Sequence, residues 1–369
     1  MARGWFGFED ALGPERVLHL WHARLGLEAV VVVDNTACGP AIGGVRMAPD
    51  VSTEECFRLA RAMTFKNAAA GLRHGGGKAV IRADPAMPLA QKERLLRAFA
   101  CAIRDLEAYI PGPDMGTDER AMAWVRDEIG RAVGLPRELG GIPLDEIGAT
   151  GHGLAVACEV ACRFAGIALE KARVAIQGFG AVGRHAARRL AERGCRIVAV
   201  SDSKGTLLAE DGLDVPALLA HKAKGAPVAA FPGGRAASSD AIVAVECDIW
   251  IPAARPDVIH EGNVDRLRTK IVVSGANIPI TPAAEAALEA RGVLQVPDFI
   301  ANAGGVICAA VEYAGGSEAE ALAVIAEKIR ANTEAVLERA YRERIPARRA
   351  AEELARERIE KAMDLRRFG

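Results

Sequence analysis

The sequence predicts an α/β fold with two domains, the second of them a Rossmann-like dinucleotide-binding domain. The chain has 369 residues, more than one ordinary hydrophobic core covers, so two domains are expected. Apolar strands alternate with amphipathic helices along most of the chain, a pattern typical of α/β folds. In the second half, a glycine-rich turn joins a strand to a helix, which is typical of dinucleotide-binding units.

The composition favours small-molecule chemistry over binding to nucleic acid or membranes. The 47 basic and 48 acidic residues leave a net charge of −1, which gives no electrostatic basis for such partners. No apolar stretch has the length of a membrane span, and residues 1–7 lack the features of a targeting segment. The eight cysteines show no CxxC pair and no metal-site spacing, so we expect no metal and a reduced, cytoplasmic location.

The first half is expected to contain a strand, a helix, a second strand and a long amphipathic helix, over residues 27–34, 53–70, 79–82 and 89–106. Gly43 and Gly44 follow the first strand, and by themselves they indicate only a turn. Ser52 and Glu55 form a capping box at the start of the helix. Gly71 is its expected C-cap.

Two lysines near the end of this helix are candidate functional residues. Lys66 lies on the apolar stripe of Leu59 and Met63, and a charge there costs free energy unless it meets an anion. For Lys66 alone, snorkelling to solvent is the favoured interpretation. The glycines at 75–77 would let the backbone approach a bound group and present Lys78. Two converging lysines lower each other's pKa, and burial lowers it further, so Lys78 is a candidate base.

Asp114 supplies a third candidate group. It lies in a loop just before a helix that Thr117 would cap, where the helix dipole would keep the carboxylate ionised. An isolated Pro-Asp is more often a turn residue. With Lys66 and Lys78, however, Asp114 completes a chemically sensible set: a cation for a substrate carboxylate, a base for water, and a carboxylate that moves a proton at nitrogen.

The dinucleotide motif lies between two predicted strands, residues 171–176 and 196–201. The candidate pyrophosphate contacts are the loop residues Gly178, Phe179, Gly180, Ala181, Val182 and Gly183. Asp202 ends the second strand and would accept hydrogen bonds from the adenosine ribose, which favours NAD over NADP. Ser203 and Lys204 could still bind the 2′-phosphate of NADP.

Two further strands are expected at residues 248–251 and 270–274, and the segments after them would line the nucleotide crevice. These segments carry Ala253, Ala254 and Asn277. Asn302 precedes another helix and is accounted for as a helix cap without any ligand. In the C-terminal tail, acids interleave with arginines, which indicates a solvated helix rather than an RNA-binding arm.

Together these residues resemble the glutamate/leucine/phenylalanine/valine dehydrogenases, enzymes of the reversible oxidative deamination of L-amino acids. The resemblance covers nearly the whole chain. The motifs that carry it are Gly39-Pro40-Ala41-Ile42-Gly43-Gly44, Lys66-Asn67-Ala68-Ala69-Ala70-Gly71 with Gly75-Gly76-Gly77-Lys78, Pro113-Asp114-Met115-Gly116-Thr117, Ala149-Thr150-Gly151, the loop 178–183, Gly275-Ala276-Asn277 and Asn302-Ala303-Gly304-Gly305-Val306.

The resemblance implies a role for each of these residues. Lys66 would pair with the substrate α-carboxylate, Lys78 would activate water for attack on the imine, and Asp114 would move a proton at the amino nitrogen. Thr150 and Asn277 would hold the nicotinamide end of the cofactor. The further substrate-binding candidates are Gly43, Gly44, Met63 and Asn302, the last of which could contact the nicotinamide instead.

The resemblance also implies a domain organisation. It assigns residues 1–145 to a substrate-binding and oligomerisation domain, 146–335 to the Rossmann-like domain, and 336–369 to a C-terminal helix that packs back on the first domain. Catalysis would take place in a cleft that closes between the domains. Family members are closed homo-oligomers, so we expect the same of this chain.

Two positions favour an apolar substrate such as leucine, valine or phenylalanine. In the glutamate branch of the family, a lysine at the position of Ile42 and a serine at that of Ala309 bind the side-chain carboxylate, and neither residue here can do so. An unpaired carboxylate would cost roughly several kcal/mol. The alternative is a glutamate dehydrogenase that uses Arg46 or Arg73 as the cation.

Two other function classes stay open. A regulatory subunit that binds nucleotide or amino acid without turnover would usually lack a catalytic group, whereas Lys66, Lys78 and Asp114 are all present. A dinucleotide-binding protein of unrelated chemistry would leave the first 145 residues unexplained.

Overall fold

The structure is a computed structural model that describes residues 7–367. The expected lack of a targeting segment concerns residues 1–7, of which the first six lie outside the described residues. The chain forms two compact units. Unit 1 comprises residues 1–143, 306–321 and 352–369, and unit 2 comprises residues 144–305 and 322–351.

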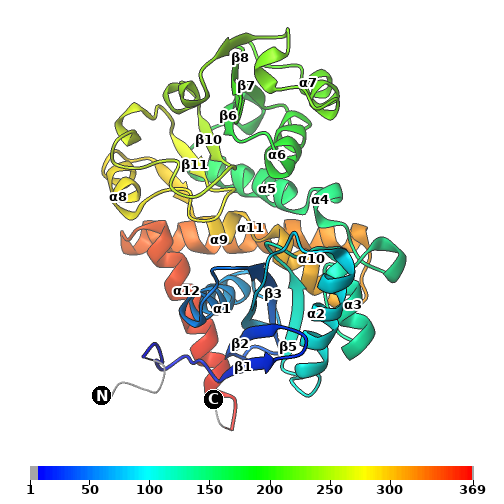
Figure 1. The fold of residues 1–369 in the computed structure, drawn as a ribbon. Coiled ribbons are helices and arrows are strands. Elements are labelled where there is room, and N and C mark those ends of the chain that lie inside the picture. The colour runs from blue at the N-terminus through cyan, green and yellow to red at the C-terminus, as the bar shows by residue number, and fades with distance from the viewer. Residues whose placement is uncertain (1–6, 368–369) are drawn as a thin grey trace. The chain divides into compact units, whose positions relative to one another are not determined.

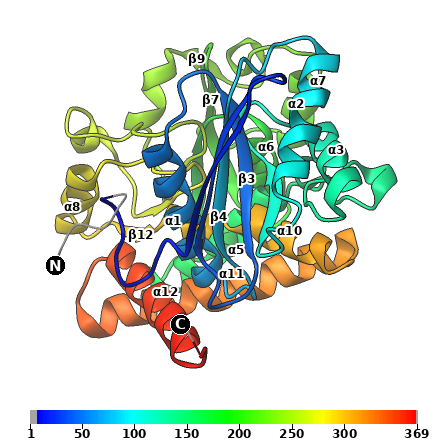
Figure 2. The ribbon, with the colours of Figure 1, turned by 60° about the horizontal axis from the view of Figure 1, so that its bottom comes forward.

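Unit 1 is built on a mixed five-stranded sheet. Its elements are β1 (Arg16–His22), β2 (Leu27–Asn35), β3 (Ala41–Ala48), α1 (Thr53–Ala69), β4 (Gly75–Arg82), α2 (Leu89–Ala102), β5 (Tyr109–Pro113), α3 (Glu119–Ile129) and most of α10 (Gly304–Tyr313). The strand order is β1-β2-β4-β3-β5. β3 lies parallel to both β4 and β5, whereas β2 is antiparallel to β1 and β4. Figure 2 shows α1 on one side of β3 and β4, and α2 and α3 on the other.

Side chains of β3 alternate between the two faces of this sheet. Ala41, Val45 and Met47 enter a core shared with α2 and α3. The residues between them, Ile42 and Arg46 among others, therefore face the side of α1. Lys78 of β4 lies on the same side, because the residue before it and the residue after it belong to the α2/α3 side.

Two glycine segments differ from the prediction. Gly43 and Gly44, predicted as a turn, lie in the middle of β3. The glycines at 75–77, predicted as a loop beside a bound group, begin β4. The reason is close approach between backbones: a Cβ on Gly43 would lie 1.6 Å from the carbonyl oxygen of Gly77.

Helix α1 begins where predicted, since the Ser52 hydroxyl accepts a hydrogen bond from the Glu55 N–H at 3.1 Å. Gly71 follows its end with φ +69°. Leu59 and Met63, predicted to be on the buried stripe, are only half-buried. The buried residues of α1 are Cys56, Ala60, Thr64, Asn67, Ala68 and Ala69. The stripe is rotated from the prediction because these residues face β2 and β4.

Unit 2 contains a seven-stranded sheet of order β12-β11-β10-β6-β7-β8-β9. Figure 1 shows the part of this order from β11 to β8. Its elements are α4 (Leu144–Ile147), α5 (Ala149–Phe164), β6 (Arg173–Gln177), α6 (Ala181–Ala191), β7 (Arg196–Asp202), β8 (Gly205–Leu208), α7 (Val215–Ala223), β9 (Arg235–Ala237), β10 (Ile249–Pro252), β11 (Ile271–Val273), α8 (Pro282–Ala290), β12 (Leu294–Val296), α9 (Asp298–Ala301), and parts of α11 (Glu318–Glu343) and α12 (Ala347–Asp364). The five strands from β12 to β7 are parallel, and β8 and β9 add antiparallel pairs. The four predicted strands appear as β6, β7, β10 and β11, with ends within two residues of the prediction.

The C-terminal region contains two helices rather than the single one predicted over residues 336–369. The break between α11 and α12 lies at Arg344, which has φ +54°, and Pro346 follows two residues later. Within unit 1, Arg358 donates to the carbonyl of Ala68 at 3.3 Å, and Arg366 donates to the carbonyl of Ala37 at 2.9 Å. The end of the chain therefore packs on α1 and on the loop after β2.

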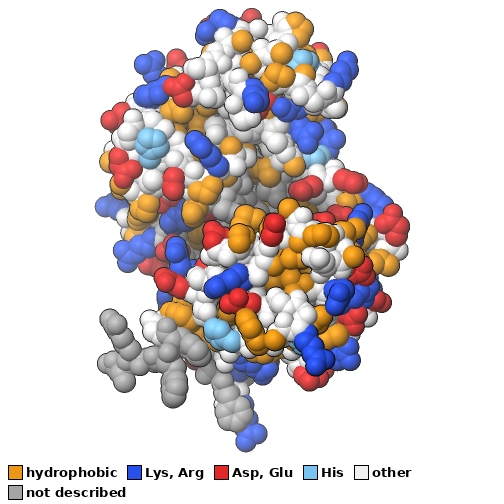
Figure 3. Space-filling view, in the orientation of Figure 1, with side chains coloured by type: hydrophobic (Ala, Val, Ile, Leu, Met, Phe, Trp, Pro, Cys, Tyr) orange, Lys and Arg blue, Asp and Glu red, His pale blue; other side chains and the backbone are white. Residues whose placement is uncertain are grey.

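Among residues 7–367, no helix is long and apolar enough to cross a membrane. Figure 3 shows basic and acidic side chains interspersed over the visible face, in keeping with the near-zero net charge.

Candidate active site

Lys78 lies on β4 with 6% of its surface exposed, and its amine forms an ion pair with Asp114. Burial is the main cause that lowers the pKa of Lys78, to about 8, and the charge of Arg46 adds to it. The charge of Lys66 acts in the same direction but ranks behind these two causes. The Asp114 carboxylate opposes the shift by favouring the ammonium form. The predicted lowering is confirmed, although its main cause is burial and not the second lysine.

Asp114 directly follows β5, and Thr117 fixes its backbone. The Asp114 N–H donates to the Thr117 hydroxyl at 2.9 Å, and that hydroxyl donates to the carbonyl of Val45 at 2.8 Å. The prediction that Thr117 caps α3 is wrong, because Asp118 accepts the capping hydrogen bond from Ala121 N–H at 2.8 Å. Since α3 begins only at residue 119, side-chain cations rather than the helix dipole stabilise the Asp114 charge.

Arg46 is a member of this cluster that the sequence interpretation missed. Its guanidinium lies 3.5 Å from the Asp114 carboxylate and 2.6 Å from that of Glu55. It was predicted only as a cation for a substrate side chain. The alternation of side chains along a strand could have predicted this position, because Arg46 follows Gly44 by two residues and therefore lies on the same face of β3.

Gly44 makes room for the pairing of Lys78 with Asp114. A Cβ on Gly44 would lie 2.7 Å from the Cβ of Asp114. The neighbouring Gly43 carbonyl accepts a hydrogen bond from the hydroxyl of Tyr109 at 2.8 Å, and Tyr109 is fully buried. The two glycines thus contribute through backbone contacts, which no side chain at these positions would permit.

Ile42 and Ala309, the two predicted specificity residues, lie together. They form an apolar cluster with Ile110 and Val133. Of the two cations predicted for a glutamate side chain, Arg46 pairs with Asp114 and Glu55, and Arg73 is exposed. On α1, Met63 and Lys66 are half-buried.

In unit 2, the loop after β6 has the geometry of a pyrophosphate cradle. Gly178 has φ +98°, and a Cβ on Gly183 would lie 1.9 Å from the Gly178 carbonyl oxygen. A Cβ on Gly180 would meet nothing within 4 Å, so the space beside it is open. Helix α6 starts at Ala181 without a side-chain cap among the described residues. Its first N–H groups are therefore available to an anion. The other members of the loop are Phe179, which is buried, and Val182.

Asp202 ends β7, as predicted, but its carboxylate is already engaged. It accepts hydrogen bonds from the Lys222 amine at 2.5 Å, from Val228 N–H at 3.0 Å and from Lys204 N–H at 2.9 Å. Burial by itself would raise the pKa of Asp202, but these hydrogen bonds outweigh it and hold the pKa below its usual range. Lys222 thus places a cation beside the predicted ribose-binding acid.

A cavity of about 520 Å³ lies next to this loop. It is lined by the candidate residues Gly178, Asp202, Ser203 and Ala254, and by Gln177. The Gln177 side-chain oxygen is buried and has no hydrogen-bond partner among the described residues, which suits a bound ligand that donates a hydrogen bond. Ala253, the neighbour of Ala254, pairs its N–H with the carbonyl of Gln177 at 2.7 Å.

Asn302 and Asn277 also lie together. The Asn302 amide donates to the Asn277 side-chain oxygen at 2.9 Å. Asn302 directly follows α9 as its C-cap residue, but its side chain reaches residues 275–277 and does not cap the next helix as predicted. Its own side-chain oxygen is buried without a partner among the described residues. Thr150 of α5 lies near Gly304 and Gly305: an added Cβ would lie 3.0 Å from the Thr150 Cα at Gly304 and 3.7 Å from its hydroxyl at Gly305.

Within residues 7–367, no three His, Cys, Asp or Glu side chains are grouped so that they could hold a metal ion.

Two family profiles match the chain. The profile described as "Glutamate/Leucine/Phenylalanine/Valine dehydrogenase" covers residues 140–367, and "Glu/Leu/Phe/Val dehydrogenase, dimerisation domain" covers residues 16–131. The chain belongs to this family.

Relatives of the chain include the glutamate dehydrogenase of Aeropyrum pernix, 40% identical over 356 residues, with 90% of this chain and 85% of the relative covered. The NADP-specific glutamate dehydrogenase of Saccharolobus shibatae is 39% identical, with 76% and 69% covered.

Two solved structures share the fold of this family member. The hetero-hexameric glutamate dehydrogenase of Thermus thermophilus in its Leu-bound form has a TM-score of 0.81 at 31% identity, covering 95% of this chain and 90% of that chain. The L-tryptophan dehydrogenase of Nostoc punctiforme has a TM-score of 0.77 at 26% identity, covering 95% and 97%. The chain is thus an oxidoreductase, an amino acid dehydrogenase, with the predicted two-domain α/β fold.

Proposed function

We propose that the chain catalyses the NAD(P)-dependent, reversible oxidative deamination of L-glutamate. The observation that carries the reaction type is the ion pair of buried Lys78 with half-buried Asp114, beside Arg46. The choice of glutamate rests on the glutamate dehydrogenases to which the chain is similar. The choice of NAD(P) rests on the loop after β6 and on the NADP-specific relative.

In this proposal, Lys66, Lys78 and Asp114 each have a distinct role. Lys66 pairs with the substrate α-carboxylate. Asp114 first takes a proton from the substrate ammonium group. NAD(P), which the loop after β6 would hold, would supply the acceptor for the hydride on the substrate Cα, and loss of that hydride turns the amine into an iminium. Neutral Lys78 accepts a proton from water as that water adds to the iminium carbon, and a pKa of about 8 gives it a neutral fraction near physiological pH. Asp114 then returns its proton to the nitrogen of the carbinolamine. Ammonia leaves as the carbinolamine hydroxyl loses its proton to solvent, and the 2-oxo acid remains.

An apolar amino acid such as leucine, valine or phenylalanine is the second candidate substrate. The observation in its favour is the apolar cluster of Ile42, Ile110, Val133 and Ala309. A glutamate carboxylate placed against this cluster would need a cation, and Arg46 is paired elsewhere. The two candidates therefore rest on different observations.

A substrate panel separates them. Initial rates with glutamate, leucine, valine and phenylalanine, each with NAD and with NADP, should be highest with glutamate. Highest rates with leucine, valine or phenylalanine would replace glutamate by the second candidate. The variant Ile42→Lys, compared with Ile42→Leu, should raise the ratio of glutamate to leucine turnover, because it places a cation at the cluster.

A catalytically silent regulatory subunit is opposed by the presence of Lys66, Lys78 and Asp114. The absence of amino-acid-dependent NADH or NADPH formation by the purified chain, restored by a partner subunit, would support it instead.

We also propose that the chain forms a homo-oligomer, because its first half matches the dimerisation domain of the family. The scattered cysteines support a cytoplasmic location.

A further inference from the structure

Ile278 has an unusual backbone conformation next to Asn277. Its φ is +42°, and 57% of its surface is exposed. A β-branched residue rarely adopts this left-handed region, so surrounding contacts must hold it there. Two hydrogen bonds do so: the Ile278 N–H donates to the Asp298 carboxylate at 2.7 Å, and its carbonyl accepts from Asp257 N–H at 3.0 Å.

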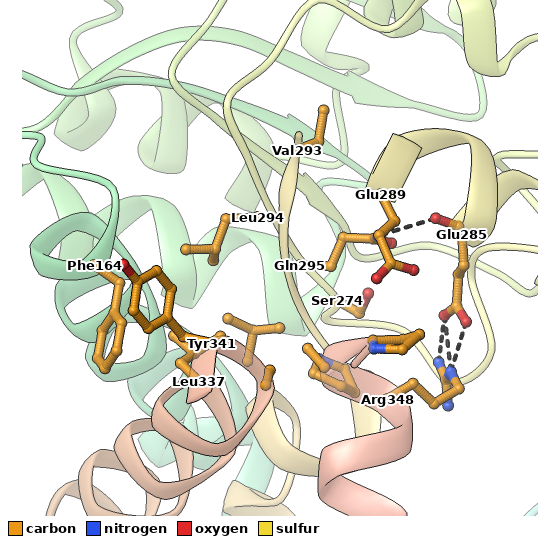
Figure 4. A pocket seen from close by; sticks show the side chains of 15 residues that line it. Phe164, Ser274, Glu285, Glu289, Val293, Leu294, Gln295, Leu337, Tyr341 and Arg348 are labelled. Atoms are coloured by element: carbon orange, nitrogen blue, oxygen red, sulfur yellow. Dashed lines mark hydrogen bonds and ion pairs between the residues drawn. The ribbon is translucent and has the colours of Figure 1, made fainter. Parts of the chain in front are cut away.

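Asp298 is buried, with 5% of its surface exposed, at the start of α9. Its second carboxylate oxygen accepts a hydrogen bond from Arg348 at 3.0 Å. Arg348 also binds both oxygens of Glu285 at 2.7 and 2.8 Å (Figure 4). The buried charge of Asp298 is therefore paired, and a second carboxylate, that of Glu285, fixes the arginine.

Asp298 is hydrogen-bonded next to both members of the Asn277–Asn302 pair. Asp298 fixes Ile278, the residue after Asn277, through its side chain. Its backbone carbonyl accepts the N–H of Asn302 at 2.7 Å. The side-chain oxygen of Asn302 is buried and has no hydrogen-bond partner among residues 7–367. Asp298 therefore helps to set the direction of this oxygen, because it binds Ile278 and the backbone of Asn302.

We propose that Asp298, held by Arg348, is a positioning residue for the nicotinamide end of the coenzyme. It acts through Ile278 and the Asn277–Asn302 pair and does not touch the coenzyme itself. This inference rests on the proposed function and on the place of Asn277 at the nicotinamide end of the coenzyme, which the family resemblance implies.

The test compares Asp298→Ala with Glu285→Ala. Both variants remove a carboxylate that binds Arg348, but only Asp298 also binds Ile278. Calorimetric titration with NADH and with ADP-ribose, which lacks the nicotinamide, gives a readout that needs no turnover. Asp298→Ala should weaken NADH binding about tenfold, the size of one lost charge-assisted hydrogen bond. Binding of ADP-ribose should change by less than about twofold, and Glu285→Ala should change neither.

Two further variants distinguish positioning from a general structural role. Asp298→Asn keeps an acceptor for the Ile278 N–H and should recover most of the NADH affinity. Adding Ile278→Gly to Asp298→Ala should recover part of it, because glycine adopts a positive φ without support. Equal weakening of NADH and ADP-ribose, or of neither, would overturn the proposal. A wild-type chain that binds NADH but deaminates no amino acid would contradict only the proposed function.

Discussion

Lys78 and Asp114 form an ion pair across an intervening strand: Lys78 lies on β4, Asp114 follows β5, and β3 separates the two. Gly44 of β3 lies under the pair, and a Cβ there would approach the Asp114 carboxylate to 3.1 Å. The cluster thus depends on one position that has no side chain.

Lys78→Ala should reduce kcat by about 10²- to 10⁴-fold, the usual contribution of a general base. Binding of NADH should be unchanged, because the dinucleotide motif lies in unit 2. Steady-state kinetics and a NADH titration test this together. A variant with full turnover would contradict the role of Lys78 as the base.

The pH profile of kcat/KM should rise with pH through about 8, the pKa of Lys78. Below this pH the amine is protonated and cannot accept a proton, so the rate falls on the acid side. Asp114→Asn removes the negative charge that favours the ammonium form. The pKa of Lys78 should therefore fall further, and the acid limb should move to lower pH while kcat also drops. A limb that moves to higher pH would contradict this assignment.

Gly44→Ala and Gly43→Ala should fail in different ways. A methyl group at Gly44 would press on the Asp114 side chain, 2.7 Å away, and a displacement of about 1 Å can cost roughly 10²-fold in rate. A methyl group at Gly43 would meet the Gly77 carbonyl at 1.6 Å, so it should lower the melting temperature as well. Thermal unfolding and kcat of both variants provide the comparison, and loss of stability alone at Gly44 would count against the model of the cluster.

Lys222→Gln should change the coenzyme preference. The Lys222 amine pairs with Asp202 at 2.5 Å, and without it the carboxylate would repel the 2′-phosphate of NADP. We expect kcat/KM for NADP to fall about tenfold, with a smaller change for NAD. Lys224→Gln is the matched control, because Lys224 directly follows the same helix and is exposed. Equal losses of kcat/KM with NAD and with NADP would show that Lys222 does not recognise the 2′-phosphate.

The parts of the fold that local sequence determines were predictable. The loop from Gly178 to Gly183 follows a strand and opens a helix, as its spacing indicates. The Ser52 cap of α1 likewise depends on residues within one turn. In both cases the interacting residues are close in sequence, so the local sequence pattern is enough to predict the structure.

The errors arose where distant segments decide the outcome. Gly43 and Gly44 were predicted as a turn because glycine is a local turn signal, but β4 and β5 on either side make them a strand. The place of Arg46 beside Asp114 depends on that same strand. The engagement of Asp202 by Lys222, twenty residues later in the chain, could not be predicted from the dinucleotide motif itself.

The three-segment composition of unit 1 limits how the protein can be dissected. A fragment that ends at residue 143 would contain Lys78 and Asp114, yet it would lack Ala309 and the C-terminal arginines that bind Ala37 and Ala68. It would also lose Glu312, whose buried carboxylate accepts the N–H groups of Leu135 and Ile142. Exchange of unit 2 for that of another protein would thus have to proceed by insertion into the gene, because end-to-end fusion would leave unit 1 incomplete.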